Sequence, residues 1–146
     1  MQIEGHYSFD TPITKVWDLL IDPDIVAQCL PGCEKLEPLG NDRYRVTLRV
    51  AIAAISGKFG GILSILEKKP PHSYKLLVDG SGSQGFVKGR TSILLKQDGK
   101  KTLVHVSGDL QVGGLIARVG QRMLGSVSKM MMDRFYTCLG TRASKC

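Results

Sequence analysis

A long helical pattern near the C-terminus most constrains what this chain can fold into. Between Gly113 and Leu139, apolar residues recur at steps of three and four, which is the spacing of one helix face. This apolar stripe comprises Ile116, Val119, Gly120, Met123, Val127, Met130, Met131 and Cys138. The pattern predicts one helix of about seven turns, beginning after Gly113-Gly114 and capped at its C-terminus by Gly140. Because no second long helix is predicted, the stripe must pack on β structure.

The predicted stripe is rich in methionine, and two residues do not fit its pattern. Methionine is flexible and suits a surface that repacks around apolar partners, although ordinary core packing is the simpler interpretation for any single one. Met132 falls on the polar side of the predicted helix. Arg134 falls within the stripe, so it either emerges near the helix end or places a cation at the mouth of a pocket.

Length and charge restrict the class of protein. The 146 residues predict a single domain, 1–146. No apolar run approaches the roughly 20 residues that span a bilayer, and the N-terminus lacks a signal-peptide layout, which predicts a cytoplasmic protein. The net charge of +7 favours acidic partners such as an anionic membrane surface. Nucleic acid is not expected, because basic residues form no block and aromatic residues are only 6%.

The four cysteines do not form a metal-binding or redox motif. Cys29 and Cys33 are too far apart for C-x-x-C, and neither Cys138 nor Cys146 supplies a second cluster at zinc spacing. In a cytoplasmic chain, reduced thiols are expected. No metal and no cofactor are predicted.

The remainder of the chain predicts two short helices and a series of strands. Alternation predicts a strand at 2–9, and Asp10 or Thr11 is expected to cap a helix with Pro12 in its first turn. A second helix is expected at 23–30. Turn residues and alternation then predict strands at 33–39, 44–52, 59–68, 73–80, 86–96 and 102–112, with a flexible turn at 80–85.

This order of elements predicts an α+β fold. A curved antiparallel sheet of about six to seven strands would wrap around the long C-terminal helix, with the two short helices after the first strand closing one end. Curvature leaves a space between sheet and helix, and an apolar cavity there is the usual form of a small-molecule site.

Five motifs follow one another along the chain: I-E-G-H-Y-S-F-D-T-P at 3–12 with Val16-Trp17, D-P-D-I-V-A-Q-C-L-P-G-C-E at 22–34, I-S-G-K-F-G-G at 55–61, G-S-G-S-Q-G-F-V-K-G at 80–89 and V-G-G-L-I-A-R-V-G-Q-R at 112–122. Together they resemble the helix-grip fold of the START/Bet v 1-like (SRPBCC) superfamily, and most closely the CoxG family, the G subunit of carbon monoxide dehydrogenase. Their order covers essentially the whole chain.

The resemblance implies an accessory protein of molybdenum CO-dehydrogenase-type oxidoreductases. Its implied partners are the subunits of that enzyme and an apolar molecule, quinone or lipid-like. The implied roles are carrying that molecule or recruiting the enzyme to the membrane. Some relatives continue into a membrane-anchoring tail that this sequence lacks, so transient electrostatic contact with the inner membrane face is the most that is expected.

No catalytic constellation is evident in the sequence. His6, His72 and His105 have no second histidine at metal spacing, and no hydrolase or protease motif occurs. Asp79 and Asp109 lie near strand ends, where a turn or capping role is the plain interpretation. We therefore expect a protein that is not an enzyme.

Candidate ligand-binding residues are the apolar ones expected to face the space between sheet and helix. They are Trp17, Leu30, Leu48, Val50, Leu76, Val78, Phe86, Met123, Val127, Met130, Met131 and Phe135. Two alternatives remain open. One is a cavity enzyme, cyclase- or hydrolase-like, with a histidine or carboxylate in the pocket. The other is an interaction adaptor that uses the basic strand face of Arg43, Arg45 and Arg49.

Overall fold

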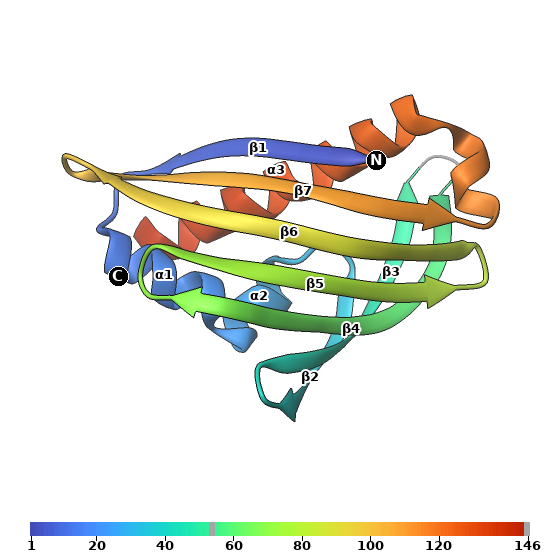
Figure 1. Cartoon of the computed structure of the whole chain (residues 1–146), viewed down its shortest axis with the longest axis horizontal. Coiled ribbons are helices and arrows are strands. Elements are labelled where there is room, and N and C mark those ends of the chain that lie inside the picture. Colours follow the sequence, from blue (N-terminus) through green and yellow to red (C-terminus); the bar gives the residue numbers. More distant parts are fainter. Residues whose placement is uncertain (53–54, 145–146) are drawn as a thin grey trace.

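A computed structural model describes residues 1–52 and 55–144 as one curved sheet with helices on one side of it (Figure 1). The strands are β1 (Gln2–Phe9), β2 (Cys33–Gly40), β3 (Arg43–Ile52), β4 (Ile55–Lys69), β5 (Ser73–Gly82), β6 (Gly85–Asp98) and β7 (Lys101–Gly113). The helices are α1 (Ile13–Ile21), α2 (Pro23–Cys29), the 3₁₀ helix η1 (Leu115–Val119) and α3 (Gln121–Ser144). This arrangement confirms the predicted α+β helix-grip architecture.

The sheet is antiparallel throughout, with strand order β1-β7-β6-β5-β4-β3-β2. From β2 to β7, each strand pairs with the next one in sequence, and β1 pairs with β7. Strands β1 and β2 are therefore the two edges of the sheet. Helix α3 runs behind the sheet and contacts β1, α1 and α2 (Figure 1). Alternate residues of each strand therefore face either the helices or the outer surface.

Strand positions agree with the prediction except around the glycines of β4 and β5. Strand β4 begins at Ile55, four residues before the expected start at 59, and β5 continues to Gly82. The expected flexible turn at 80–85 is wrong in extent, because Gly80 to Gly82 pair with 59–61 of β4. Glycine-rich sequence suggested a loop, whereas cross-strand pairing holds these residues in the sheet.

The two short helices follow β1 as expected, but the first is capped differently. The residue at its N-cap is Pro12, and neither Asp10 nor Thr11 takes that place. Thr11 is instead held by tertiary contact, since its carbonyl accepts a hydrogen bond from the buried Thr102 hydroxyl at 2.6 Å. Helix α2 has a side-chain cap, because Asp22 accepts from the backbone N–H of Asp24 at 2.9 Å.

The predicted single C-terminal helix is divided at Gly120. That residue has φ +91°, a conformation that favours glycine, and it separates η1 from α3. Gly140 is not a cap, because α3 continues through it to Ser144. The break also rotates the buried face, which now contains Leu124, Tyr136 and Leu139.

The predicted stripe is consequently displaced by about one residue. Met123, expected to be buried, is 37% exposed, and the expected outlier Met132 packs on the core. Arg134 is exposed and does not interrupt the apolar face. The helical phase changes at Gly120, so positions before and after it do not share one continuous face.

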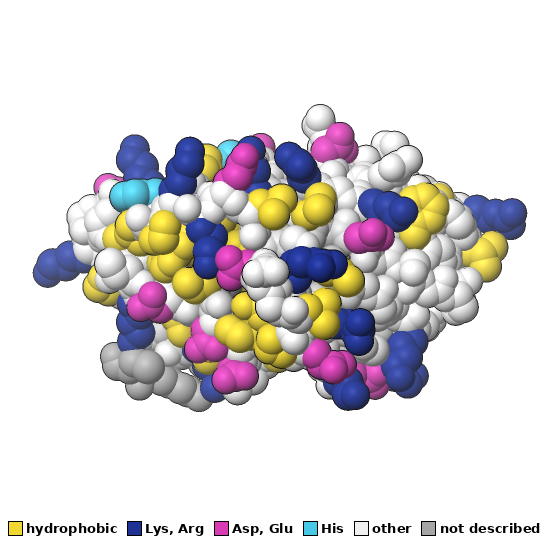
Figure 2. Space-filling view, turned by 60° about the horizontal axis from the view of Figure 1, so that its bottom comes forward, with side chains coloured by type: hydrophobic (Ala, Val, Ile, Leu, Met, Phe, Trp, Pro, Cys, Tyr) yellow, Lys and Arg dark blue, Asp and Glu magenta, His cyan; other side chains and the backbone are white. Residues whose placement is uncertain are grey.

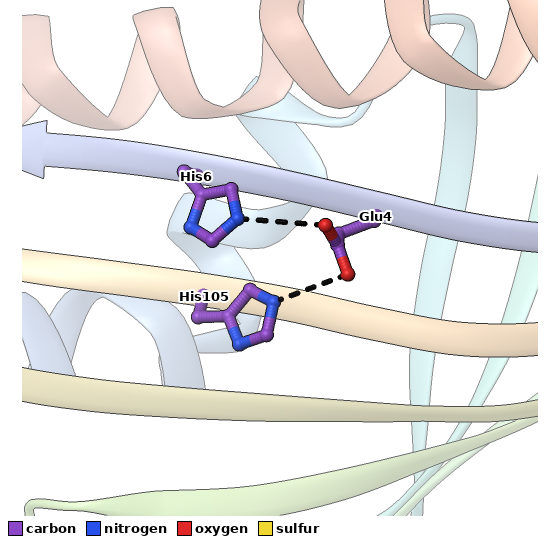
Figure 3. Close-up of side chains that lie close together, drawn as sticks. All are labelled: Glu4, His6 and His105. Atoms are coloured by element: carbon purple, nitrogen blue, oxygen red, sulfur yellow. Dashed lines mark ion pairs between the residues drawn. The ribbon is translucent and has the colours of Figure 1, made fainter.

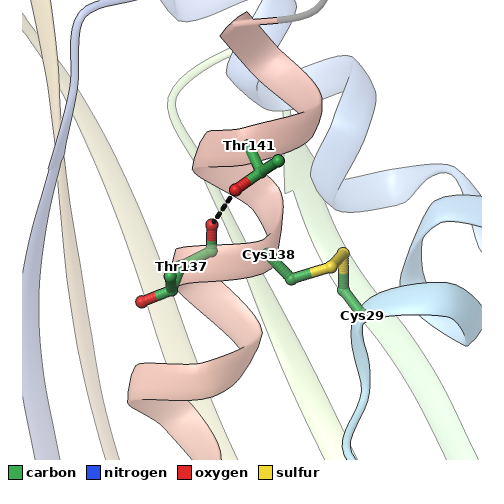
Figure 4. The surroundings of a disulfide bond; sticks show 4 residues. All are labelled: Cys29, Thr137, Cys138 and Thr141. Atoms are coloured by element: carbon green, nitrogen blue, oxygen red, sulfur yellow. Dashed lines mark hydrogen bonds between the residues drawn. A yellow bond between two sulfur atoms is a disulfide. The ribbon is translucent and has the colours of Figure 1, made fainter.

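A disulfide joins α2 to α3 between Cys29 and Cys138 (Figure 4). The expectation of reduced thiols at these positions is therefore wrong. Packing of α2 against α3 brings together two cysteines that are separated by 109 residues in sequence. Cys33 is a free thiol, and Cys146 lies outside the described residues.

Within residues 1–52 and 55–144, no helix is both long and apolar enough to cross a membrane.

Candidate ligand cavity

An apolar cavity of about 370 Å³ lies between the sheet and the helices. Strand β3 contributes Tyr44, Val46 and Leu48, and its sheet neighbours β4 and β5 continue the same wall. Val26 of α2 and Leu30, the residue just after that helix, close one side, and α3 contributes residues from 128 to 136. The volume falls in the range of small-molecule sites.

Strand alternation and close strand packing create this space. On β5, Tyr74, Leu76 and Val78 all line the cavity, and the register pairs Leu76 with Ile65 and Val78 with Leu63 of β4. Gly61 allows β4 and β5 to approach closely at this point, because a Cβ there would overlap the backbone of Asp79 and Gly80.

The cavity surface is interrupted by two buried tyrosines. Tyr74 is 4% exposed and Tyr136 is 7% exposed, and both line the cavity. The Trp17 ring meets the Tyr74 ring edge-on at 5.5 Å, and the Tyr7 ring stacks on that of Tyr136 at 4.2 Å. These aromatic contacts fix the rings at the end of the cavity nearest α1 and β1.

Burial keeps these phenols neutral. It raises the pKa of Tyr74, and it raises the pKa of Tyr136 well above its usual value, with further contributions from Tyr74 and Tyr7. Among the residues that the structure describes, neither of the two hydroxyls is hydrogen-bonded, whereas the Tyr7 hydroxyl donates to Asp133 at 2.8 Å. Tyr74 and Tyr136 thus offer two free donors inside a mostly apolar space.

Half of the residues predicted from sequence to bind a ligand line this cavity. The six that do are Leu30, Leu48, Leu76, Val78, Met131 and Phe135. The other six lie elsewhere: Trp17, Val50, Phe86, Met123, Val127 and Met130.

The six residues outside the cavity have other positions for identifiable reasons. Trp17 is buried in the core that α1 forms with the sheet, and Val50 belongs to a second core cluster against which Val127 packs. The Phe86 ring lies against Gly113 and beneath the Lys88 ammonium group. Met123 and Met130 are turned out of the cavity by the break at Gly120.

Sequence reasoning missed several lining residues. Met132 and Tyr136 line the cavity but were not predicted to, because the helical phase changes at Gly120. Val26 and Leu30 are four residues apart on and just after α2, and that spacing could have identified Val26 once Leu30 had been chosen.

The acid–base candidates lie apart from the cavity or at its edge. His6, His105 and Asp109 do not line it. Asp79 touches it, yet this residue is exposed, and its neighbours Val78 and Gly80 take the inward side. In the described part of the chain, no histidine, lysine or arginine lines the cavity. The geometry supports binding of a neutral apolar molecule more than acid–base chemistry.

The surface around these elements combines apolar and charged groups. In the face shown in Figure 2, hydrophobic side chains reach the surface in the middle, between acidic and basic ones. No single sign of charge dominates this face.

Solved structures with the same fold span nearly the whole chain. A conserved protein from Geobacillus kaustophilus is 36% identical, with a TM-score of 0.97 over 99% of this chain and 96% of that one. A START superfamily protein from Mycobacterium smegmatis has a TM-score of 0.79 at 11% identity, covering 99% of this chain and 97% of that one. A protein of Thermus thermophilus has a TM-score of 0.73 at 10% identity, covering 99% and 98%. The last two similarities show the fold alone.

A comparison with curated protein sequences found no match. The sequence does match the model of the CoxG family, described as the G subunit of carbon monoxide dehydrogenase, over residues 5–144. The match covers every residue that lines the cavity except Ile3, and this chain belongs to the CoxG family of carbon monoxide dehydrogenase subunits.

Proposed function

We propose that this chain is a non-catalytic accessory protein that carries a neutral apolar molecule, quinone or lipid-like, for a CO-dehydrogenase-type molybdenum oxidoreductase. The observation that supports this proposal best is the cavity of about 370 Å³ with its apolar wall. Family membership supports the link to the enzyme.

The energetics favour an apolar occupant. Each 100 Å² of apolar ligand surface removed from water contributes about 2.5 kcal/mol, from which the entropic cost of binding is subtracted. A charged head group would be poorly accommodated, because no described cation lines the cavity.

The two free phenols favour a ligand that carries a hydrogen-bond acceptor. The hydroxyls of Tyr74 and Tyr136 can donate to a carbonyl oxygen, and each such bond contributes about 0.5–1.5 kcal/mol. A quinone has neutral carbonyl oxygens on an apolar ring and therefore suits both the wall and the donors. A fatty acid, with its ionised carboxylate, suits them less well.

Two neighbouring positions on β5 provide a matched test. Val78→Phe adds bulk inside the cavity, whereas Leu77→Phe adds similar bulk at a position that is 37% exposed and outside the cavity. Trp17 is the only tryptophan, and its contact with Tyr74 makes its fluorescence a reporter of ligand binding. We expect a short-chain quinone to quench it, with affinity at least tenfold weaker in Val78→Phe and within twofold of the original in Leu77→Phe.

Extraction of the purified protein supplies a second measurement. Mass spectrometry of the organic extract should reveal an apolar molecule that is depleted in Val78→Phe. Equal quinone affinity in both variants, or no quinone binding and no extracted molecule from the unmodified protein, would contradict the proposal.

A further inference from the structure

A cluster of metal-ligating side chains lies on the face of the sheet opposite the cavity. His6 of β1 and His105 of β7 are directly paired across the two strands, and Glu4 precedes His6 by two residues on the same face (Figure 3). The adjacent Tyr7 and Val104 point the other way, toward the core. Two hydrogen-bonded strands thus present three side chains to the same point on the outer surface.

The donor atoms of this cluster converge. The Nε2 atom of His6 lies 3.6 Å from Oε1 of Glu4, and the Nε2 atom of His105 lies 3.6 Å from Oε2. The two imidazole rings stack at 4.4 Å with an angle of 8° between their planes. One ligand atom from each residue lies within 4.8 Å of the other two.

One of these nitrogens lacks the hydrogen bond that its burial demands. His105 Nε2 is buried and has no hydrogen-bond partner in the described structure. Buried polar atoms are nearly always paired, and leaving one unpaired destabilises the folded state. A 3.6 Å separation from Glu4 is too long to supply the bond. A metal ion between the three side chains would use this nitrogen as a ligand.

We propose that Glu4, His6 and His105 bind a zinc ion. Two imidazole nitrogens and one carboxylate oxygen are a known zinc ligand set, with bonds of about 2.0–2.2 Å and a fourth position left to water. Zinc binding at that distance requires the exposed side chains of Glu4 and His6 to rotate, because the stacked imidazole nitrogens must turn toward one ion. Imidazole ligands favour zinc over magnesium or calcium, which prefer oxygen.

The strands hold the three side chains rigidly at their base, and each side chain is at least partly exposed to solvent. The side chains of His6 and Glu4 are 71% and 66% exposed, and that of His105 is 37% exposed. A bound zinc would link the edge strand β1 to β7 in addition to their backbone hydrogen bonds. Such an ion binds only the folded chain and therefore stabilises it.

The test is a zinc titration of the untagged chain by calorimetry. Every chain tested carries the substitutions Cys33→Ser and Cys146→Ser, because thiols are alternative zinc ligands. The chain with these two substitutions alone is the parent. We expect one zinc ion per chain, and an affinity at least tenfold weaker in Glu4→Ala, in His6→Ala and in His105→Gln. His72→Ala is the matched control, since it removes an exposed histidine outside the cluster and should leave the affinity unchanged.

Two further measurements separate site loss from misfolding. Cobalt should give an intense tetrahedral absorption spectrum with the parent chain and with His72→Ala, and lose it with His6→Ala. Zinc should raise the melting temperature of the parent and of His72→Ala but not that of His6→Ala, whose metal-free melting temperature stays that of the parent. Unchanged zinc affinity in His6→Ala, or no stoichiometric binding to the parent, would overturn the proposal.

Discussion

At the residue scale, the disulfide between Cys29 and Cys138 connects α2 to α3, a pairing that the spacing of cysteines in the sequence does not predict. Cys29 is 5% exposed at the end of α2, and its partner lies in the second half of α3. Their bond lies beside the cavity, since Leu30 and Phe135, close to the two cysteines in sequence, both line it. The disulfide therefore fixes part of the cavity wall.

Removal of this bond should lower stability. A disulfide that closes a long loop typically contributes about 2–4 kcal/mol, so Cys138→Ala should lose that amount in denaturant unfolding. A reducing agent should lower the midpoint of the unmodified protein toward that of the variant, and it should leave the variant unchanged.

The free thiol provides the control for this prediction. Cys33→Ser changes a half-buried cysteine outside the bond and should alter stability by no more than about 0.5 kcal/mol. An unfolding midpoint of the unmodified protein that does not respond to reductant would show that no such bond forms.

At the residue scale, sequence identified inward-facing strand residues better than inward-facing helix residues. Leu48, Leu76 and Val78 follow from alternation, which two faces of a sheet impose directly. The disulfide depends on tertiary packing between α2 and α3, so cysteine spacing within 29–33 carried no information about it.

Among the elements, the junction between η1 and α3 determines which side of the last helix faces the sheet. Gly120 has φ +91° and ψ 156°, a region that is essentially open only to glycine. The chain therefore stops one helix and starts another, with a new phase. Which side of α3 a residue occupies must therefore be counted from the start of α3 at Gln121.

Two glycines of this segment should respond to alanine in opposite directions. Gly120→Ala should destabilise the protein by about 1–3 kcal/mol, because the backbone conformation is unfavourable for alanine. Gly125→Ala lies within α3, where nothing lies within 4 Å of the added Cβ, and should stabilise by about 0.5–1 kcal/mol.

Thermal or denaturant unfolding of the two variants measures this difference. No contact lies within 4 Å of a Cβ at Gly120 either, so crowding cannot explain a loss. A gain in stability from both substitutions would mean that the helix is continuous across Gly120, as the sequence pattern alone suggests.

For the elements, the sequence was sufficient to predict all seven strands and both short helices, because turn residues and alternation mark them locally. It was insufficient for the last helix, because apolar periodicity continues across Gly120 without indicating the change of direction. Only the positive φ of that residue reveals the break.

At the scale of the whole molecule, the three arginines of β3 differ in whether they are available to a partner. Arg43 and Arg45 are exposed on the outer face of β3, the face opposite the cavity residues Tyr44 and Val46. Arg49 differs, since it pairs with Glu34 at 3.3 Å together with Lys58. Hydrogen bonds from these two cations lower the pKa of Glu34 and keep it ionised.

Charge reversal tests whether this basic face contacts a membrane. Arg43→Glu with Arg45→Glu lowers the net charge by four, from +7 to +3. We expect the unmodified chain to sediment with vesicles of anionic lipid at low salt and to be released at high salt. The double variant should lose most of this binding.

A variant of equal charge elsewhere separates local contact from bulk charge. Lys96→Glu with Lys100→Glu also gives +3, with the changes near the β6–β7 turn. Equal losses in both double variants would indicate diffuse attraction, and no vesicle binding by the unmodified chain would contradict a role at membranes.

Among the described residues, β2 pairs with β3 alone, so the other side of β2 is an open edge of the sheet. Pro38 has no N–H to offer there, Lys35 and Glu37 are charged, and the pairing with β3 slips at two places. A strand from another molecule would meet irregularly spaced hydrogen-bond donors and acceptors at this edge, so it could not pair with β2 in continuous register. The fold thus resists fibre growth from this border even when the protein is concentrated.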